Sequence, residues 1–512
     1  MLSVSAQAFV VVLALHVMQM VLHQVYRAPR ELNFLLLIGL LPLSIALSTT
    51  GWLLPLDQKG FWAARVPLNI MSVAPVVGPA MQRVLLGGTD FSHHTLTRFV
   101  ALHTTLLPAL TGTLLAAYLY LTHRHRATDA ELVATPGPAR GYWPDQALKD
   151  AVGCLVVLAT VLFIVLRSGG GREPGVELLA PANPAESYSA ARPEWFMLWL
   201  FHFLKLFPGG TEVWGAVVIP TLALLILAAM PWTCRWRHGA RFNTGFILVV
   251  AVGVVVLSGL AIRQDRNDPA YAAAVKQAEA EAERARHLAG GTNGIPAAGA
   301  LELVRMDPLS QGPRLFARHC ASCHRFDGHD GLHQLPTDPP SAADLRGFAS
   351  REWIAGLLDP ARVATPHYFG GTKFAQGKMV KYVQKRIAGL KPESQPELAK
   401  VVAALSAEAQ LPGQRGVDAA EAGVIEAGRA LIRGKEFNCI ECHAFRQPDD
   451  SATAPELTGY GSRAWLMAFL ADPAHGSFYG RRNDRMPRFG AEGLLTPAEI
   501  GLLADWLRGD WP

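Results

Sequence analysis

Charged residues are scarce in this chain, and long apolar runs are missing from its second half. Asp, Glu, Lys and Arg make up 17% of the 512 residues, and the formal net charge is +5. So small a positive excess, without a basic stripe, argues against a nucleic-acid-binding protein. After about residue 264 no apolar run is long enough to span a bilayer, so the second half is expected to be soluble.

The first half contains six apolar stretches of about the length that crosses a bilayer as a helix. They lie at about 4–24, 34–54, 99–121, 150–167, 213–231 and 244–262. Two weaker stretches, about 66–86 and 194–207, look amphipathic and interfacial. The first run lacks a basic start, so it is expected to be a span and not a cleaved signal peptide. The pattern predicts an all-α fold that begins with a transmembrane bundle.

Cysteine is also scarce: there are six, and four of them lie in two copies of one motif. The copies are Cys320-Ala321-Ser322-Cys323-His324, the first haem signature, and Cys439-Ile440-Glu441-Cys442-His443, the second haem signature. C-x-x-C-H attaches c-type haem, because the two thiols form thioethers and the His supplies one iron ligand. The alternatives are a thioredoxin-like dithiol or half of a zinc site. Duplication of the motif favours two covalent haems.

A second iron ligand is expected after each signature, and a Met there would raise the haem potential. Met379 is the only Met between the two signatures, although His367 competes with it. After the second signature, Met486 is favoured over Met467, because Met467 lies in an apolar helical run where core packing is the usual role. The order of the motifs pairs Met379 with the first signature and Met486 with the second.

The two signature segments form an internal repeat that resembles tandem class I cytochrome c over about residues 302–512. Gly347-Phe348-Ala349-Ser350-Arg351-Glu352-Trp353 parallels Gly459-Tyr460-Gly461-Ser462-Arg463-Ala464-Trp465. The last helix is expected at about 497–507, with Thr496 as its N-cap. The predicted organisation is a membrane domain at 1–263, a linker at 264–300 with a helix over 272–288, and cytochrome c-like domains at 301–413 and 414–512.

The membrane half resembles cytochrome b of the bc-type quinol oxidoreductases over about residues 10–262. The resemblance rests on motifs in the family's order: Tyr26-Arg27-Ala28-Pro29-Arg30-Glu31, Gly51-Trp52-Leu53-Leu54-Pro55 with Phe61-Trp62-Ala63-Ala64, Gly87-Gly88, Thr95-Leu96-Thr97-Arg98-Phe99, Asn183-Pro184 and Pro193-Glu194-Trp195-Phe196. On this alignment the family's first helix has no counterpart, and the six spans correspond to its shorter form. The resemblance implies contact with membrane lipid, quinol as substrate, and a Rieske-type iron–sulfur subunit among other complex subunits as partners.

The resemblance also implies two b-type haems, each held by a His from the family's second and fourth helices. His16 and His103 match one ligand of each pair. On each helix the family's other His, which binds the other haem, would lie about four helical turns away on the same face. Leu2 stands at one of these positions and Ala117 or Tyr118 at the other, and none of these side chains is a His. His23 could substitute as a ligand, a partner chain could supply one, or the b haems are lost and His16 and His103 are core histidines.

Glu194 matches the family's proton acceptor for quinol oxidation, while Phe196 replaces the Tyr of the family motif. An apolar pocket would raise the pKa of this carboxyl into a useful range for accepting a proton. The alternative is a carboxylate at an aqueous interface, with Trp195 as a membrane-belt anchor.

Covalent haem attachment belongs to the extracytoplasmic side, which sets an expected topology. With six spans, the first, third and fifth connections would then face the cytoplasm. Each of these three connections carries positively charged residues: Arg27, Arg30, Arg124, Arg126, Arg235, Arg237 and Arg241. This agrees with the positive-inside rule and predicts a multi-pass protein of the bacterial inner membrane, with the cytochrome c-like domains in the periplasm.

Two functions fit these expectations. The chain is either the fused cytochrome b/c subunit of a quinol:cytochrome c oxidoreductase, which passes electrons through two c haems to a soluble acceptor, or a dihaem carrier. In the second case a degenerate cytochrome b domain, without b haems or quinol oxidation, anchors the carrier and docks partners.

Overall fold

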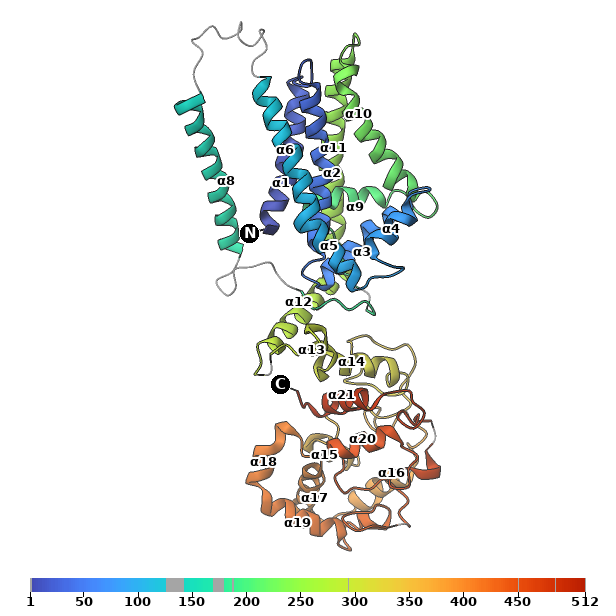
Figure 1. Cartoon of the computed structure of the whole chain (residues 1–512). Helices are drawn as coiled ribbons and strands as arrows, with labels where there is room; N and C mark the ends of the chain where they lie inside the picture. The colour runs from blue at the N-terminus through green and yellow to red at the C-terminus, as the bar shows by residue number, and fades with distance from the viewer. Residues whose placement is uncertain are drawn as a thin grey trace. The chain divides into compact units, whose positions relative to one another are not determined.

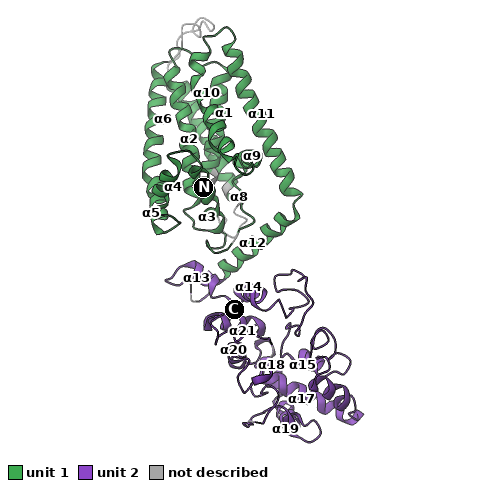
Figure 2. Cartoon of the chain, turned by 90° about the vertical axis from the view of Figure 1, so that its right-hand side faces the viewer, with its two compact units in different colours: residues 1–287 green, residues 288–512 purple. Residues whose placement is uncertain are grey.

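The computed structural model describes residues 2–125, 142–168, 179–186, 188–292, 294–449, 451–483 and 485–511. Its backbone divides into two compact units, residues 1–287 and 288–512 (Figure 2). Within the described ranges the secondary structure is helical, with isolated β-bridges and no strand, as the predicted all-α fold requires.

Among its described residues, the first unit contains six helical stretches long and apolar enough to cross a membrane, which confirms the predicted number of spans. They are Ser5–Leu22 in α1 (Leu2–Leu22), α2 (Glu31–Trp52), His93–Arg124 (α5, His93–Ala101, a π-helical turn at Leu102–Leu106, and α6, Leu107–Arg124), Trp143–Ile164 in and before α8 (Ala147–Ser168), Trp214–Thr233 (a π-helical turn at Trp214–Val218 and α10, Ile219–Thr233) and α11 (Gly239–Arg266). Helices α1, α2, α6, α10 and α11 stand together as a bundle, and α8 stands beside it (Figure 1). A membrane-embedded, multi-pass protein follows from these spans.

The interior of the bundle is built where α1, α2 and α11 meet. Phe34 and Leu37 of α2 are almost completely buried, and Val17 of α1 packs in the same cluster. Outward-facing positions of the spans remain apolar, as Val249 and Val255 of α11 show, because these positions face lipid and not water.

Short helices lie at one end of the bundle, where the sequence predicted amphipathic segments. They are α3 (Gln58–Ser72), α4 (Gly78–Leu86), a 3₁₀ turn at Trp195–Met197 and α9 (Leu198–Leu204). The buried Asp57 caps α3 by accepting a 2.7 Å hydrogen bond from Gly60 N. Asp57 also accepts a hydrogen bond from Leu179 N, so it ties α3 to the segment that leads to Glu194.

The linker helix and the second unit are helical as well. Helix α12 (Pro269–Ala289) contains the predicted linker helix, and the unit that follows consists of α13 (Ala300–Arg305), α14 (Pro308–His319), α15 (Arg351–Leu357), α16 (Lys378–Tyr382), a π-helical turn (Val383–Ile387), 3₁₀ turns (Pro392–Ser394, Pro412–Gln414, Cys439–Glu441, Gly480–Arg482), α17 (Gln395–Glu408), α18 (Arg415–Ala420), α19 (Ala422–Arg433), α20 (Arg463–Ala471) and α21 (Pro497–Arg508). Thr496 caps α21 in a capping box with Glu499, as predicted.

The two largest apolar cores among the described residues of this second unit each combine residues from both sequence repeats. The first-signature core joins Leu315, Phe316, Cys320 and Ala321 to Leu470, Phe489, Leu495, Ile500, Leu502, Leu503 and Trp506. The second-signature core joins Ile432, Phe437, Phe445 and Leu457 to Trp353, Ile354, Leu358, Val363, Tyr368, Val380, Val383, Ile387, Val401, Ala404 and Leu405. The sequence boundary at 413/414 is therefore not a boundary between cores.

Candidate haem sites

The first haem signature forms a tight turn at the end of α14. Cys320 N and His324 N donate to Phe316 O and Cys320 O, each at 2.8 Å, so the chain turns back directly after the helix. The His324 Nδ1 donates to the backbone oxygen of Ala343 at 2.7 Å. A carbonyl oxygen only accepts, so Nδ1 carries the proton and Nε2 keeps a free lone pair for iron.

The second haem signature repeats this geometry. It occupies the 3₁₀ turn Cys439–Glu441, and His443 N donates to Cys439 O at 3.1 Å. The His443 Nδ1 donates to Pro455 O at 2.6 Å, which again leaves Nε2 free. Neither Ala343 nor Pro455 was among the predicted site residues. Both stand ten residues before a repeat Trp, Trp353 and Trp465, and this shared spacing could have identified them.

Burial sets the protonation of both signatures. It lowers the pKa of His324 and of His443, which favours the neutral imidazole that binds iron. It raises the pKa of Cys320 to about 12 and that of Cys439 to about 11, so both remain protonated thiols. Protonated thiols are poor nucleophiles and poor zinc ligands, which argues against a thioredoxin-like dithiol.

A zinc site lacks the ligands it would need. In the described part of the chain, no group of three or more His, Cys, Asp and Glu side chains is placed to hold a metal ion. The two thiols and one imidazole of each signature instead suit a haem, which needs two attachment points and a neutral nitrogen donor.

The candidate second ligands lie in different cores. Half-buried Met486 packs against the first-signature core and half-buried Met379 against the second-signature core. The sulfur of the competitor Met467 accepts a hydrogen bond from Arg463 Nη1 at 3.1 Å. The other competitor, His367, packs its ring edge-on against Tyr368, with the ring centres 4.8 Å apart.

In the membrane unit, His16 meets Tyr118, one of the two residues at the position where the sequence resemblance predicts a missing His ligand. The His16 Nε2 and the Tyr118 hydroxyl share a 2.7 Å hydrogen bond across α1 and α6. This separation suits a direct hydrogen bond and leaves no place for an iron between the two atoms. The neighbouring Ala117 offers no donor atom, so this position does not fit a bis-His b haem.

His103 also has a protein partner. It lies in the π-helical turn before α6, and its Nδ1 is 3.1 Å from Thr50 Oγ1 of α2. Its ring packs on Gly51, where a Cβ atom would come within 2.8 Å of His103 Cε1. The backbone of Leu2 begins α1, but its side chain lies outside the described residues. His23, the suggested substitute ligand, is exposed at the end of α1.

Glu194 stands in a polar cluster and not in an apolar pocket. Its carboxylate accepts hydrogen bonds from Lys59 Nζ at 3.0 Å and from Gln7 Nε2 at 3.3 Å. Gln7 also accepts a 2.8 Å hydrogen bond from Trp195 Nε1. The sequence reading missed Lys59 and Gln7 because α1, α3 and the segment before α9 are far apart along the chain.

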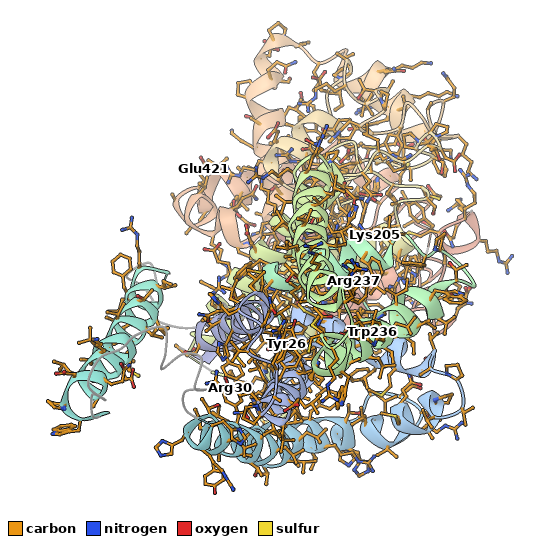
Figure 3. The ribbon with its side chains drawn as sticks, turned by 90° about the horizontal axis from the view of Figure 1, so that it is seen from above. Tyr26, Arg30, Lys205, Trp236, Arg237 and Glu421 are labelled. Atoms are coloured by element: carbon orange, nitrogen blue, oxygen red, sulfur yellow. The ribbon has the colours of Figure 1, made fainter. Side chains whose placement is uncertain are left out.

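The opposite end of the bundle joins the first, third and fifth connections. Arg30 Nε donates to His125 O at 3.2 Å, and Asn243 Nδ2 donates to the Tyr26 hydroxyl at 3.2 Å. Figure 3 looks onto this end, with Tyr26 and Arg30 on the first connection and Trp236 and Arg237 on the fifth. Arg126 lies outside the described residues.

The six candidate spans among the described residues define a multi-pass membrane protein. Residues 7–190 match the family model "Cytochrome b(N-terminal)/b6/petB" and residues 181–276 match "Cytochrome b(C-terminal)/b6/petD". Through residues 7–276 the chain therefore belongs to the cytochrome b family, whose members carry haem, usually b-type.

Curated relatives support the same assignment. Cytochrome b of Allochromatium vinosum is 29% identical over 277 residues, which cover 51% of this chain and 66% of that protein. The cytochrome bc complex cytochrome b subunit of Chlorobaculum thiosulfatiphilum is 30% identical, over 51% of this chain and 60% of that protein. The chain thus spans less than two thirds of the length of these relatives. A chain of a hyperthermophilic respiratory Complex III aligns with a TM-score of 0.39 and 19% identity, over 51% of this chain and 77% of that chain.

Proposed function

We propose that the chain is a membrane-bound electron-transfer subunit of a bc-type respiratory complex, and that electrons pass through two c-type haems attached to Cys320 and Cys323 and to Cys439 and Cys442. The observation that carries this proposal is the duplicated bond from the Nδ1 of a buried signature His to a backbone carbonyl. Both imidazoles are thereby oriented as iron ligands, and Met379 and Met486 are the candidate ligands on the other side. A bound haem would supply the one-electron chemistry.

The membrane half is proposed to anchor the carrier and to dock other subunits of the complex. The hydrogen bond between the His16 Nε2 and the Tyr118 hydroxyl favours this assignment over a second electron path through b haems. The quinol:cytochrome c oxidoreductase function, with quinol as substrate and a Rieske-type iron–sulfur subunit as partner, is the second candidate.

The position of the Glu194 carboxylate favours the second candidate, the quinol:cytochrome c oxidoreductase function. Its carboxylate lies between Lys59 and Gln7 at the end of the bundle where the family motif expects a proton acceptor. In that function Glu194 would take a proton from quinol, and Lys59 would hold the carboxylate in place. We place the signatures and a soluble electron acceptor on the periplasmic side of a bacterial inner membrane, because covalent haem attachment occurs there.

Haem counting tests the proposal. The intact mass of the denatured, purified chain should exceed the polypeptide mass by two haems, and acid acetone should extract no b-type haem in stoichiometric amount. A mass increase of one haem or none would refute the proposed electron path. Two extractable haems per chain that are lost when His16→Ala and His103→Ala are combined would instead establish the second candidate, the quinol:cytochrome c oxidoreductase function.

A further inference from the structure

We propose that the two haem sites are crossed between the sequence repeats. The haem on the first haem signature takes Met486 as its second iron ligand, and the haem on the second haem signature takes Met379. This inference rests on the proposed covalent haems and reverses the pairing that the order of the motifs predicts.

The helix before the first signature packs on the last helix of the second repeat. Phe316 of α14 contacts Trp506 of α21 with ring centres 5.5 Å apart, and Phe326 stacks on the same indole at 4.3 Å. Gly312 lets the helices approach, because a Cβ atom there would overlap the Trp506 side chain. The first signature is thus attached to α21 and not to the last helix of its own repeat.

The helix before the second signature packs on the last helix of the first repeat in the corresponding way. A Cβ atom on Gly428 of α19 would overlap Lys400 O of α17 and would stand 2.8 Å from Ala404 Cβ. Gly312 and Gly428 each precede a completely buried residue, Phe316 and Ile432, by four positions. The two helix pairs therefore use the same crossing contact, each with a partner from the other repeat.

The segments around the two methionines follow the same exchange. Tyr382, one turn after Met379, donates its hydroxyl to Phe437 O at 2.5 Å and is also hydrogen-bonded to Cys439. Arg386 Nε donates to Glu436 O at 2.9 Å, so the chain just before the second signature is held from the Met379 side. Met486 in turn packs against the core that contains Cys320.

The chain passes from one core to the other at two equivalent points. At both points the backbone has positive φ values, 67° at Gly347 and 62° at Ala349 in one repeat, and 62° at Gly459 and 74° at Gly461 in the other. Phe348 and Tyr460 meet between the crossings with ring centres 5.4 Å apart. Leu345 and Leu457, just before the crossings, pack in the core of their own signature.

One haem domain is consequently built from a single continuous segment whose elements come in a permuted order. The other is built from two separate segments of the chain. Residues 346–458 carry α15, Met379, α17, α19 and the second signature, in that order. Residues 302–345 supply the first signature, and 459–511 return to supply α20, Met486 and α21. Each domain has a signature helix, a Met loop and a last helix. In neither domain do these three parts all come from the same sequence repeat.

Selective destruction of one haem tests the pairing in the full chain. Met379→Ala leaves one iron with an open coordination position, where hydrogen peroxide attacks the porphyrin, while the haem that keeps both ligands resists. Peptide mapping after a short peroxide treatment should show that the Cys439–Cys442 peptide has lost its haem mass and the Cys320–Cys323 peptide has kept it. Met486→Ala should give the opposite result, and each variant is the control of the other.

Loss of haem from the Cys320–Cys323 peptide in Met379→Ala would overturn the crossed pairing and leave the proposed function standing. Signature peptides without haem mass in the unmodified chain would overturn the proposed function itself. A second measurement uses a chain with Cys320→Ala and Cys323→Ala. Its single haem should keep its Met-to-iron charge-transfer absorption in Met486→Ala and lose it in Met379→Ala. The reverse result would also refute the crossed pairing.

Discussion

Single hydrogen bonds distinguish the histidines of this chain that can hold an iron from those that do not fit one. The Nδ1 atoms of His324 and His443 are used by backbone carbonyls, so the opposite nitrogen is free. In His16 it is Nε2 that is used, by the Tyr118 hydroxyl. The identity of the residue was visible in the sequence, but the atom that remains free was not, because it depends on a partner far along the chain.

The buried carboxylate of Glu408 is the residue whose loss should most weaken the second-signature region. Its side chain is 5% exposed and accepts hydrogen bonds from Arg429 Nε at 3.1 Å, Arg446 Nη2 at 2.8 Å and Gly459 N at 3.0 Å. Glu408→Ala should lower the free energy of unfolding by about 3 kcal/mol, the lower end for a broken buried ion pair, since both arginines are partly exposed. Thermal unfolding of the intact chain in detergent, followed by haem absorbance, measures this change.

Glu426→Ala is the matched control, because Glu426 pairs with the same Arg429 but is 74% exposed. An exposed pair of this kind contributes about 0–0.5 kcal/mol. Equal losses in the two variants would show that the burial of Glu408 has no energetic role.

At the scale of elements, the sequence predicted where the helices lie along the chain, but not which helices pack against each other. The six spans were recognised because each is a long apolar run, and α21 because Thr496 is a typical N-cap residue at its start. The exchange of helices between the repeats was hidden, because α14 and α19 carry equivalent contact surfaces and so do α17 and α21. A pattern shared by both repeats predicts the type of contact but not which copy provides it.

The crossing of α17 and α19 should depend on the absence of a side chain at Gly428. Gly428→Ala would force a Cβ atom into Lys400 O and should destabilise the second unit by about 1–3 kcal/mol, the usual cost of overpacking. Gly423→Ala, in the same helix but with open space around it, should be neutral or stabilising by up to about 1 kcal/mol. Thermal midpoints of the two variants provide the comparison, and a Gly428→Ala protein as stable as the parent would contradict the close crossing.

The start of α21 should make stability depend on acid pH. The hydrogen bond from Thr496 N lowers the pKa of Glu499, so the ionised carboxylate stabilises the folded state. Glu499→Gln should cost about 1 kcal/mol at neutral pH, a typical capping contribution. Since the folded pKa lies below the ordinary value of about 4.3, the difference between parent and variant should persist above that pH and shrink as the pH falls further. Urea denaturation at pH 7 and at pH 3.5 tests this, and a difference that grows at low pH would be inconsistent with it.

On the scale of the whole molecule, the ends of the bundle differ in how their positive charge is compensated. At the Glu194 end, Lys59 pairs with Glu194 and Arg192 pairs with Asp265 at 3.1 Å. At the other end the arginines of three connections gather, and Arg235 has a longer contact of 3.7 Å with Glu31. The positive charges of Lys59 and Arg192 are thus partly neutralised by partners that only the fold reveals.

The orientation in the membrane follows from this asymmetry and can be measured by thiol labelling. The Arg-rich end should face the cytoplasm, and the end of α11 from which the signature-bearing unit continues should face the periplasm. In a chain with Cys154→Ser and Cys234→Ser, a new thiol in Gly209→Cys, before α10, should react with a membrane-impermeant maleimide in intact spheroplasts. Arg237→Cys, in the turn between α10 and α11, should react only after the membrane is permeabilised. Both sites are exposed turns, so each controls for the reactivity of the other. Labelling of Arg237→Cys but not Gly209→Cys from outside would place both signatures in the cytoplasm, where the proposed haem attachment does not take place.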